Sequence, residues 1–223
     1  MIADVSTVET TLETQRSTRG RRATRISSDE REQAIMRTAE LLLERCSLKE
    51  ISVDDLARGA GISRPAFYFY FPSKDAVVLT LVDRLVEEAT NAKEEALDQG
   101  IDDPVAAWRR SIKIFYEMLD AHRAVIRAVV ELSATNAEAR ELRCQLTEGW
   151  VGRATSRIEA ERRRGAAKRG LPARELATAL VQMNERVMLA VFAEEKPAVS
   201  AGKLVDVLGE IWLSAIYGDS HPR

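Results

Sequence analysis

The sequence contains few of the residues that build disulfide scaffolds, metal centres or catalytic sites. Only two cysteines and two histidines occur in 223 residues. Cys46 and Cys144 are far apart and show no metal-ligand spacing, which argues against a zinc site and indicates a reducing, cytoplasmic compartment. His122 and His221 accompany neither a nucleophile nor a metal set, and no Gly-rich phosphate loop is present. We therefore expect no metal, no cofactor and no enzymatic activity.

Long apolar runs are also missing from the sequence. No stretch of about 18 apolar residues without charge occurs, so we expect no transmembrane helix. The first 15 residues lack the basic and apolar segments of a secretory signal. Apolar residues make up 45% of the chain and charged residues 30%, which is typical of an ordinary globular protein.

Signals for β-strands are absent, whereas helical signals continue from Ser27 almost to the end. Branched residues do not alternate with polar ones, and no Asn-Gly or Asp-Gly hairpin dipeptide occurs. We predict an all-α fold of about nine helices, with three short helices followed by longer ones. Their predicted starts lie near residues 27, 52, 63, 74, 104, 122, 136, 172 and 200.

The net charge of −2 conceals an uneven distribution near the N-terminus. Residues 1–15 carry only acidic charges, whereas residues 16–25 carry five arginines and no acid. A local basic run matters more to a phosphate backbone than the total charge, because screening weakens interactions beyond about 10 Å. We predict that residues 1–26 form a disordered basic arm. A solvated tail without a DNA role is the alternative.

The segment from Ile51 to Lys74 predicts a helix-turn-helix. A short helix begins after Ser52 and stops at Gly61, and a second begins after Ser63 with Pro65 in its first turn. Gly61 can adopt the left-handed conformation that the turn needs. Two such short helices bury too little surface to stand alone, so we expect them to pack on the preceding helix. We therefore predict a DNA-binding domain over residues 27–73.

Several polar side chains of this segment suit DNA. Ser63 and Arg64 lie at the start of the third helix, where side chains of such motifs reach base edges, and a guanidinium can bind a guanine or phosphate bidentately. We also expect phosphate contacts from Ser52, Tyr68 and Lys74. The alternative for the aromatic run is a plain hydrophobic core, and we prefer that interpretation for its two outer phenylalanines, Phe67 and Phe71.

The run from Val53 to Lys74 resembles the DNA-binding domain of the tetracycline-repressor family of transcriptional regulators. The resemblance rests on Leu-Ala, Gly-Ile-Ser, Phe-Tyr-Phe-Tyr-Phe and Pro-Ser-Lys, and one repressor of the family is similar to nearly the whole chain from Gly20. It implies a homodimer formed through the last two long helices, and it extends the predicted contacts with operator DNA to Ser63, Arg64, Pro65, Ala66, Tyr68 and Lys74. It also gives the arm a DNA role through Arg19, Arg21, Arg22 and Arg25.

The same resemblance implies that residues 74–223 form an effector-binding and dimerisation domain. In the similar repressor, the equivalent positions line a long apolar tunnel for a hydrophobic ligand: Trp108, Ile112, Phe115, Leu119, Trp150, Asn184, Glu185, Met188 and Leu189. From the residues alone, the aromatic and aliphatic ones could equally be core. Asn184 and Glu185 lie within an otherwise apolar helix and need partners or a ligand.

This chain departs from the similar repressor at Arg143 and Arg153, where that protein has aromatic residues, and at the neighbouring Thr147. An unpaired buried charge is costly, so each arginine must be paired or must extend to solvent. Our hypothesis is that one pairs with Glu185 or with a ligand carboxylate, and that the effector is a small hydrophobic or amphipathic molecule. The alternative is that both arginines curve to solvent at the tunnel mouth.

The predicted function is a repressor that binds operator DNA and is released by its effector. An activator or an effector-independent regulator stays open, because repression depends on where the operator lies. A helical ligand-binding protein that has lost DNA binding is a further alternative, against which the intact DNA-contact residues argue.

Overall fold

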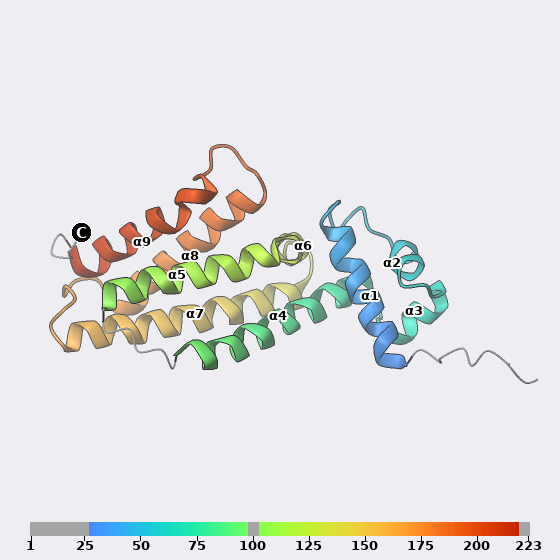
Figure 1. Ribbon diagram of the computed structural model, residues 1–223, viewed down its shortest axis with the longest axis horizontal. Helices are drawn as coiled ribbons and strands as arrows, with labels where there is room; N and C mark the ends of the chain where they lie inside the picture. Colours follow the sequence, from blue (N-terminus) through green and yellow to red (C-terminus); the bar gives the residue numbers. More distant parts are fainter. Residues whose placement is uncertain (1–26, 98–102, 219–223) are drawn as a thin grey trace, which may run out of the picture.

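The computed structural model describes residues 27–97 and 103–218, and over these ranges it contains nine α-helices and no strand (Figure 1). The predicted arm, with Arg19, Arg21, Arg22 and Arg25, lies outside the described residues. The all-α prediction is confirmed, and each helix begins within two residues of its predicted start. The helices are α1 (Ser28–Leu43), α2 (Val53–Gly59), α3 (Arg64–Tyr70), α4 (Lys74–Leu97), α5 (Pro104–Ala121), α6 (Arg123–Ser133), α7 (Ala137–Arg163), α8 (Ala173–Phe192) and α9 (Ala201–Tyr217).

The first helices begin where the sequence places capping residues. The Ser27 amide donates to Glu30 Oε2 (2.7 Å), and the Glu30 amide donates to Ser27 Oγ (3.1 Å), which completes a capping box. Ser52 and Asp55 repeat the arrangement at the start of α2. These bonds satisfy amides that no intrahelical carbonyl can reach, which stabilises short helices.

The turn between α2 and α3 has the geometry predicted from its glycine. Gly61 has φ of 68°, in the left-handed region. The next amide, of Ile62, donates back to the Ala57 carbonyl (2.9 Å), so the turn closes on the end of α2. Phe67 on α3 is completely buried, and Leu56 on α2 is buried beside it in one core. The predicted helix-turn-helix, which we call the head (residues 27–73), is thus present.

Two separate hydrophobic cores organise the described chain. The first core joins the head to the beginning of α4 and to α6, through residues such as Val78, Val82 and Val129. The predicted domain boundary between residues 73 and 74 therefore falls inside a continuous core. The head is therefore packed directly on α4 and α6.

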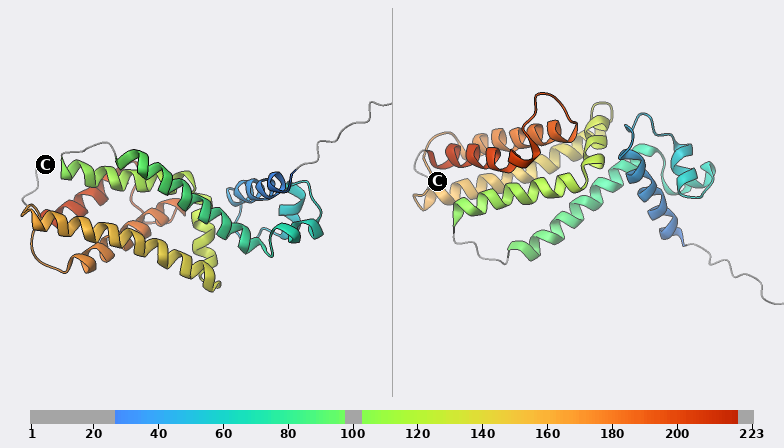
Figure 2. Two further views of the ribbon diagram at one scale, coloured as in Figure 1. Left: turned by 90° about the horizontal axis from the view of Figure 1, so that it is seen from below. Right: turned by 45° about the horizontal axis from the view of Figure 1, so that its top comes forward.

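The second core is built by α5, α7, α8 and α9, which lie side by side while α4 extends from the head along them (Figures 1 and 2). Buried hydrogen bonds join these helices. Trp108 Nε1 donates to the Tyr217 hydroxyl (3.1 Å), which donates to Glu161 Oε2 (2.8 Å). Trp212 Nε1 donates to Asn184 Oδ1 (2.9 Å). Asn184 therefore has a protein partner inside its apolar helix.

The apolar spacing of Leu204, Leu208, Ile211 and Ala215 predicts a buried face of α9 that differs from the one observed. Leu204 and Leu208 are buried, but Ile211 is 42% exposed and Ala215 is also exposed. Trp212 and Ile216 are buried instead. Both stripes satisfy helical periodicity. The indole of Trp212 selects between them, because it packs on Trp108 with ring centroids 5.2 Å apart and bonds to Asn184.

Within the described ranges, no helix combines the length and apolarity needed to cross a membrane.

Candidate DNA-binding face and effector cavity

The N-terminal end of α3 presents exposed polar side chains. Ser63, Arg64 and Pro65 are exposed, Ala66 is half-buried, and Tyr68 is 47% exposed. Ser63 caps α3 by accepting the Ala66 amide (3.3 Å). This bond uses the hydroxyl as an acceptor and leaves its hydrogen for another partner. The predicted recognition residues thus form one outward-facing group.

Arg64 is held in place by two neighbours. Its guanidinium donates to Asp54 Oδ2 on α2 (2.8 Å) and to the Tyr68 hydroxyl (3.5 Å). The hydrogen bond to Tyr68 and the charge of Asp54 raise the pKa of Arg64, so this cation persists at any physiological pH. With its side chain 55% exposed, it can exchange Asp54 for a phosphate or guanine oxygen.

Two residues predicted to bind phosphate have internal partners instead. The Lys74 ammonium donates to the carbonyls of Leu48 (2.7 Å), Ile51 (2.7 Å) and Lys49 (3.5 Å), which occupy its three hydrogens. The Ser52 hydroxyl donates to Asp55 Oδ2 (2.6 Å) and accepts the Asp55 amide. The structure therefore favours a role for Lys74 in fixing the turn before α2, and for Ser52 in capping that helix.

Phe69 is an exposed aromatic residue of α3 for which no role was predicted. Its side chain is 81% exposed, whereas Phe67 and Phe71 are buried as predicted. The signal was present in the spacing: a position two residues from each buried phenylalanine points away from their shared face on a helix. Phe69 therefore adds an apolar surface beside the recognition residues.

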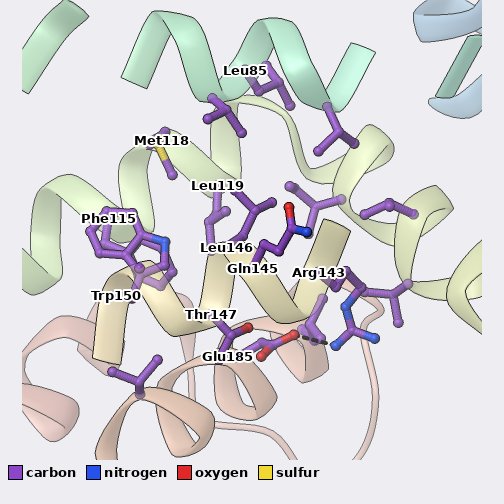
Figure 3. A pocket seen from close by; sticks show the side chains of 18 of the residues that line it. Leu85, Phe115, Met118, Leu119, Arg143, Gln145, Leu146, Thr147, Trp150 and Glu185 are labelled. Atoms are coloured by element: carbon purple, nitrogen blue, oxygen red, sulfur yellow. Dashed lines mark hydrogen bonds and ion pairs between the residues drawn. The ribbon is translucent and has the colours of Figure 1, made fainter. Parts of the chain in front are cut away.

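A cavity of about 220 Å³ lies among α4, α5, α6, α7 and α8 (Figure 3). Two thirds of the residues predicted to bind ligand line it: Phe115, Leu119, Arg143, Thr147, Trp150, Arg153, Glu185 and Leu189. Phe115 and Trp150 lie at one end, with ring centroids 4.5 Å apart, and the Arg143–Glu185 pair lies at the other (Figure 3).

Four predicted ligand residues do not line this cavity: Trp108, Ile112, Asn184 and Met188. The two polar ones are satisfied within the protein by the bonds to Tyr217 and Trp212. Met188 is completely buried and Ile112 is 4% exposed, both in the second core. In this structure the four residues are buried outside the cavity, and a longer tunnel that includes them stays a prediction.

Several lining residues were missed because they belong to helices that were not assigned to the ligand site. Val82, Leu85 and Val86 come from α4, and Val129 and Val130 come from α6. The spacing of the three α4 residues is the i, i+3, i+4 pattern of an apolar helical face, so the sequence did carry a signal. The remaining missed residues are Met118, Ile126, Gln145, Leu146, Gly149 and Val181.

The two unusual arginines differ in their pairing. Arg143 donates to Glu185 Oε1 (2.5 Å) and to Ser133 Oγ (2.9 Å), which is the pairing with Glu185 that the sequence suggested for one of them. Arg153 instead places its guanidinium 4.1 Å from the centroid of the Trp150 ring. No carboxylate in the described chain forms an ion pair with Arg153. Burial lowers the pKa of Arg153.

The part of the chain covered by the structure contains no cluster of three or more histidine, cysteine, aspartate or glutamate side chains that could hold a metal ion.

Both parts of the molecule match families of known proteins. Residues 35–81 match the family described as "Bacterial regulatory proteins, tetR family", and residues 108–218 match "Transcriptional regulator EthR, C-terminal domain". The first match covers α2, α3 and most of α1, and the second covers the helices of the second core.

Two curated relatives extend these matches across most of the chain. The chain is 51% identical to the HTH-type transcriptional regulator EthR of Mycobacterium tuberculosis over 203 residues, which are 91% of this chain and 94% of that protein. It is 48% identical to EthR of Mycolicibacterium smegmatis over 209 residues, which are 94% of this chain and 96% of that protein.

The fold is also found in solved structures of low sequence identity. A transcriptional regulator from Saccharomonospora viridis, crystallised in complex with choline, aligns with a TM-score of 0.69 at 22% identity, over 84% of this chain and 98% of that one. The head, the matched families and the extended identity agree, and the chain therefore belongs to the TetR family of bacterial transcriptional regulators, with a C-terminal domain of the EthR type.

Proposed function

We propose that this protein is a cytoplasmic, non-enzymatic repressor that binds operator DNA as a homodimer and is released by a small hydrophobic or amphipathic effector. The observation that supports this proposal best is the position of the cavity between the two cores. Val82 and Val129 contribute to its wall from the first core, and Phe115, Trp150 and Leu189 pack against the second. An occupant therefore touches both rigid parts.

A change in the separation of the two cores would reach the DNA through α4. The head packs on the beginning of α4, so a tilt of α4 carries the head with it. In a dimer, the two heads must match half-sites about 34–36 Å apart or a multiple of that spacing. An effector that binds the mismatched state more tightly, typically by about 1–3 kcal/mol, would release the operator.

A second connection runs through α6, which lines the cavity with Ile126, Val129 and Val130. Glu131 Oε2 on this helix accepts the Leu48 amide of the head (3.3 Å). Arg127 donates to the Leu43 carbonyl at the end of α1 (3.4 Å). Movement of α6 at the cavity would therefore be transmitted to the head by hydrogen bonds as well as by packing.

For the dimer, we propose the exposed face of α9, with α8 beside it. Val207 and Ile211 are 38% and 42% exposed, and Ala215 continues the same face one turn later. A stripe of this kind on each of two copies is self-complementary about a two-fold axis, which is how most homodimers form.

Sedimentation of Ile211→Asp should show a monomer, whereas Leu41→Asp, which changes an exposed leucine on α1, should stay dimeric. A wild-type monomer at micromolar concentration contradicts the proposal.

The DNA-binding part is tested by fluorescence anisotropy on the intergenic DNA upstream of the protein's own gene, at several salt concentrations. We expect tight binding that weakens steeply with salt, because phosphate contacts release counterions. Arg64→Ala should lower the affinity about 10-fold to 100-fold through loss of a base contact. Arg140→Ala removes an exposed arginine of α7 and serves as the control.

The repressor proposal fails if Arg64→Ala and Arg140→Ala bind this DNA equally. Tight DNA binding that no ligand of the cavity weakens would support an effector-independent regulator instead. Activation of a promoter by the bound protein in a reconstituted transcription assay would identify an activator.

A further inference from the structure

We infer that the cavity binds a small monocarboxylic acid with an apolar body of about one ring, and that the guanidinium of Arg153 receives the carboxylate. This inference rests on the proposed function for its regulatory meaning, and it names the chemical class of the effector.

The charges that line the cavity do not balance. Arg143, Arg153 and Glu185 are its ionic side chains, so the wall carries one excess positive charge. Arg143 is already neutralised by Glu185 at 2.5 Å and has a second acceptor in Ser133. The other polar lining side chains are the uncharged Gln145 and Thr147. The excess charge is therefore that of Arg153, and an anion from outside the described chain would complete the site.

The neighbours of Arg153 hold its guanidinium at the cavity wall. Its guanidinium lies over the Trp150 ring and 3.6 Å from the point that a Cβ atom at Gly149 would occupy. Because residue 149 is glycine, no side chain stands between the guanidinium and the helix at this point. Stacking uses one face of the guanidinium, while its N–H groups in the plane stay suited to the two oxygens of a carboxylate.

The size and the opposite end of the cavity restrict the ligand further. An apolar cavity of about 150 Å³ binds benzene, so this cavity of about 220 Å³ has room for one ring and a short chain. Phe115, Leu119 and Leu146 provide an apolar wall for such a body. At the end away from Trp150 (Figure 3), Arg143 is already paired with Glu185, so no free cation is left there for a second carboxylate. The lining thus selects monocarboxylates against dicarboxylates.

The test measures binding directly, without DNA, by calorimetry and by the fluorescence of Trp150 in the cavity wall. The probes are 4-phenylbutanoate, its methyl ester and its amide, which share one apolar body. Wild-type protein should bind the acid about tenfold more tightly than either neutral probe, in keeping with a hydrogen-bonded ion pair in a partly desolvated site.

Arg153→Gln should weaken binding of the acid about tenfold or more and leave the ester unchanged. Arg157→Gln is the matched control, because Arg157 also lies on α7 with its guanidinium over a tryptophan, 4.3 Å from the Trp108 centroid, yet does not line the cavity. Arg153→Lys keeps the charge and should retain part of the preference for the acid. Thermal unfolding of each variant identifies any loss of affinity that comes from misfolding.

Equal losses for acid and ester in Arg153→Gln would overturn the inference, as would equal binding of all three probes by the wild type. Loss of the acid preference in Arg143→Gln but not in Arg153→Gln would overturn the assignment of the carboxylate to Arg153. If the neutral ester binds as tightly as the acid and releases DNA as well, this inference fails while the proposed function stands. If DNA binding itself is absent, the proposed function fails, whatever the probes do.

Discussion

The two cores are held together by different kinds of polar bond. In the head, the polar bonds at the starts of α1, α2 and α3 join residues three positions apart, as between Ser27 and Glu30. In the second core, the buried bonds join residues 109, 56 and 28 positions apart. The helices of the head are thus capped locally and its long-range bonds run outward to α4 and α6, whereas the buried bonds inside the second core join partners distant in sequence.

This difference predicts how strongly the loss of one polar bond destabilises each core. Local caps stabilise individual helices, so their loss weakens the head in small steps. The bonds of the second core each connect two helices, so their loss leaves a buried polar group without a partner in the bundle interior. The cavity lies between the two cores, so its shape depends on how they pack against each other.

The largest effect is expected from Phe67→Ala in the first core. Phe67 is completely buried, and removal of such a ring costs about 3–5 kcal/mol. All three tryptophans belong to or pack against the second core, so their fluorescence reports that core alone, whereas circular dichroism reports all helices. In urea, the variant should lose part of its helical signal early with an unchanged fluorescence midpoint. Equal shifts of both signals would mean that the cores unfold as one unit, and the exposed Phe69→Ala serves as the control.

The second core should show a dependence on alkaline pH that involves Tyr217. Burial and the hydrogen bond to Glu161 raise the pKa of this hydroxyl to about 12. The folded state therefore holds its proton more tightly than the unfolded state, so the stabilisation is complete below pH 10 and is lost as pH rises toward 12. At about 1.4 kcal/mol for each unit of pKa, the loss approaches 2–3 kcal/mol. Fluorescence-monitored unfolding from pH 8.5 to 11.5 should give a smaller slope for Tyr217→Phe, and equal slopes would contradict this account.

Lys74 tests whether long-range bonds to the head behave like those of the second core. Lys74→Met leaves the carbonyls of Leu48 and Ile51 without their charged donor, which should lower the free energy of unfolding by about 2 kcal/mol. Lys49→Met removes an exposed lysine of the same turn and should have little effect. Unchanged stability of Lys74→Met together with weakened DNA binding would restore this lysine as a phosphate donor.

The smallest expected effect belongs to the helix caps. Ser52→Ala removes the hydroxyl that accepts the Asp55 amide, and such caps contribute about 1 kcal/mol. Ser52→Thr retains a capping oxygen and should stay near the wild type. Chemical denaturation followed by circular dichroism measures both variants, and a loss as large as that of Phe67→Ala would show that the head does not tolerate stepwise weakening.

The same difference explains what the sequence could predict. Ser27, Ser52, Gly61 and Pro65 act on neighbours a few residues away, so short motifs were sufficient to place the helices of the head. The bond from Trp108 to Tyr217 spans 109 residues, and no local pattern predicts it. Trp108 was therefore expected in the ligand tunnel, although its indole is occupied in the core.

The way in which the turn before α2 is held has a consequence for substitutions in the head. Lys74 from α4 and Glu131 from α6 both hold this turn by main-chain atoms, the carbonyls of residues 48, 49 and 51 and the amide of Leu48. Arg127 likewise binds a main-chain carbonyl of the head. Main-chain atoms are present whatever side chains the head carries. These bonds therefore do not depend on the side chains of α3, and exchange of its exposed residues leaves this connection of the head to α4 and α6 intact.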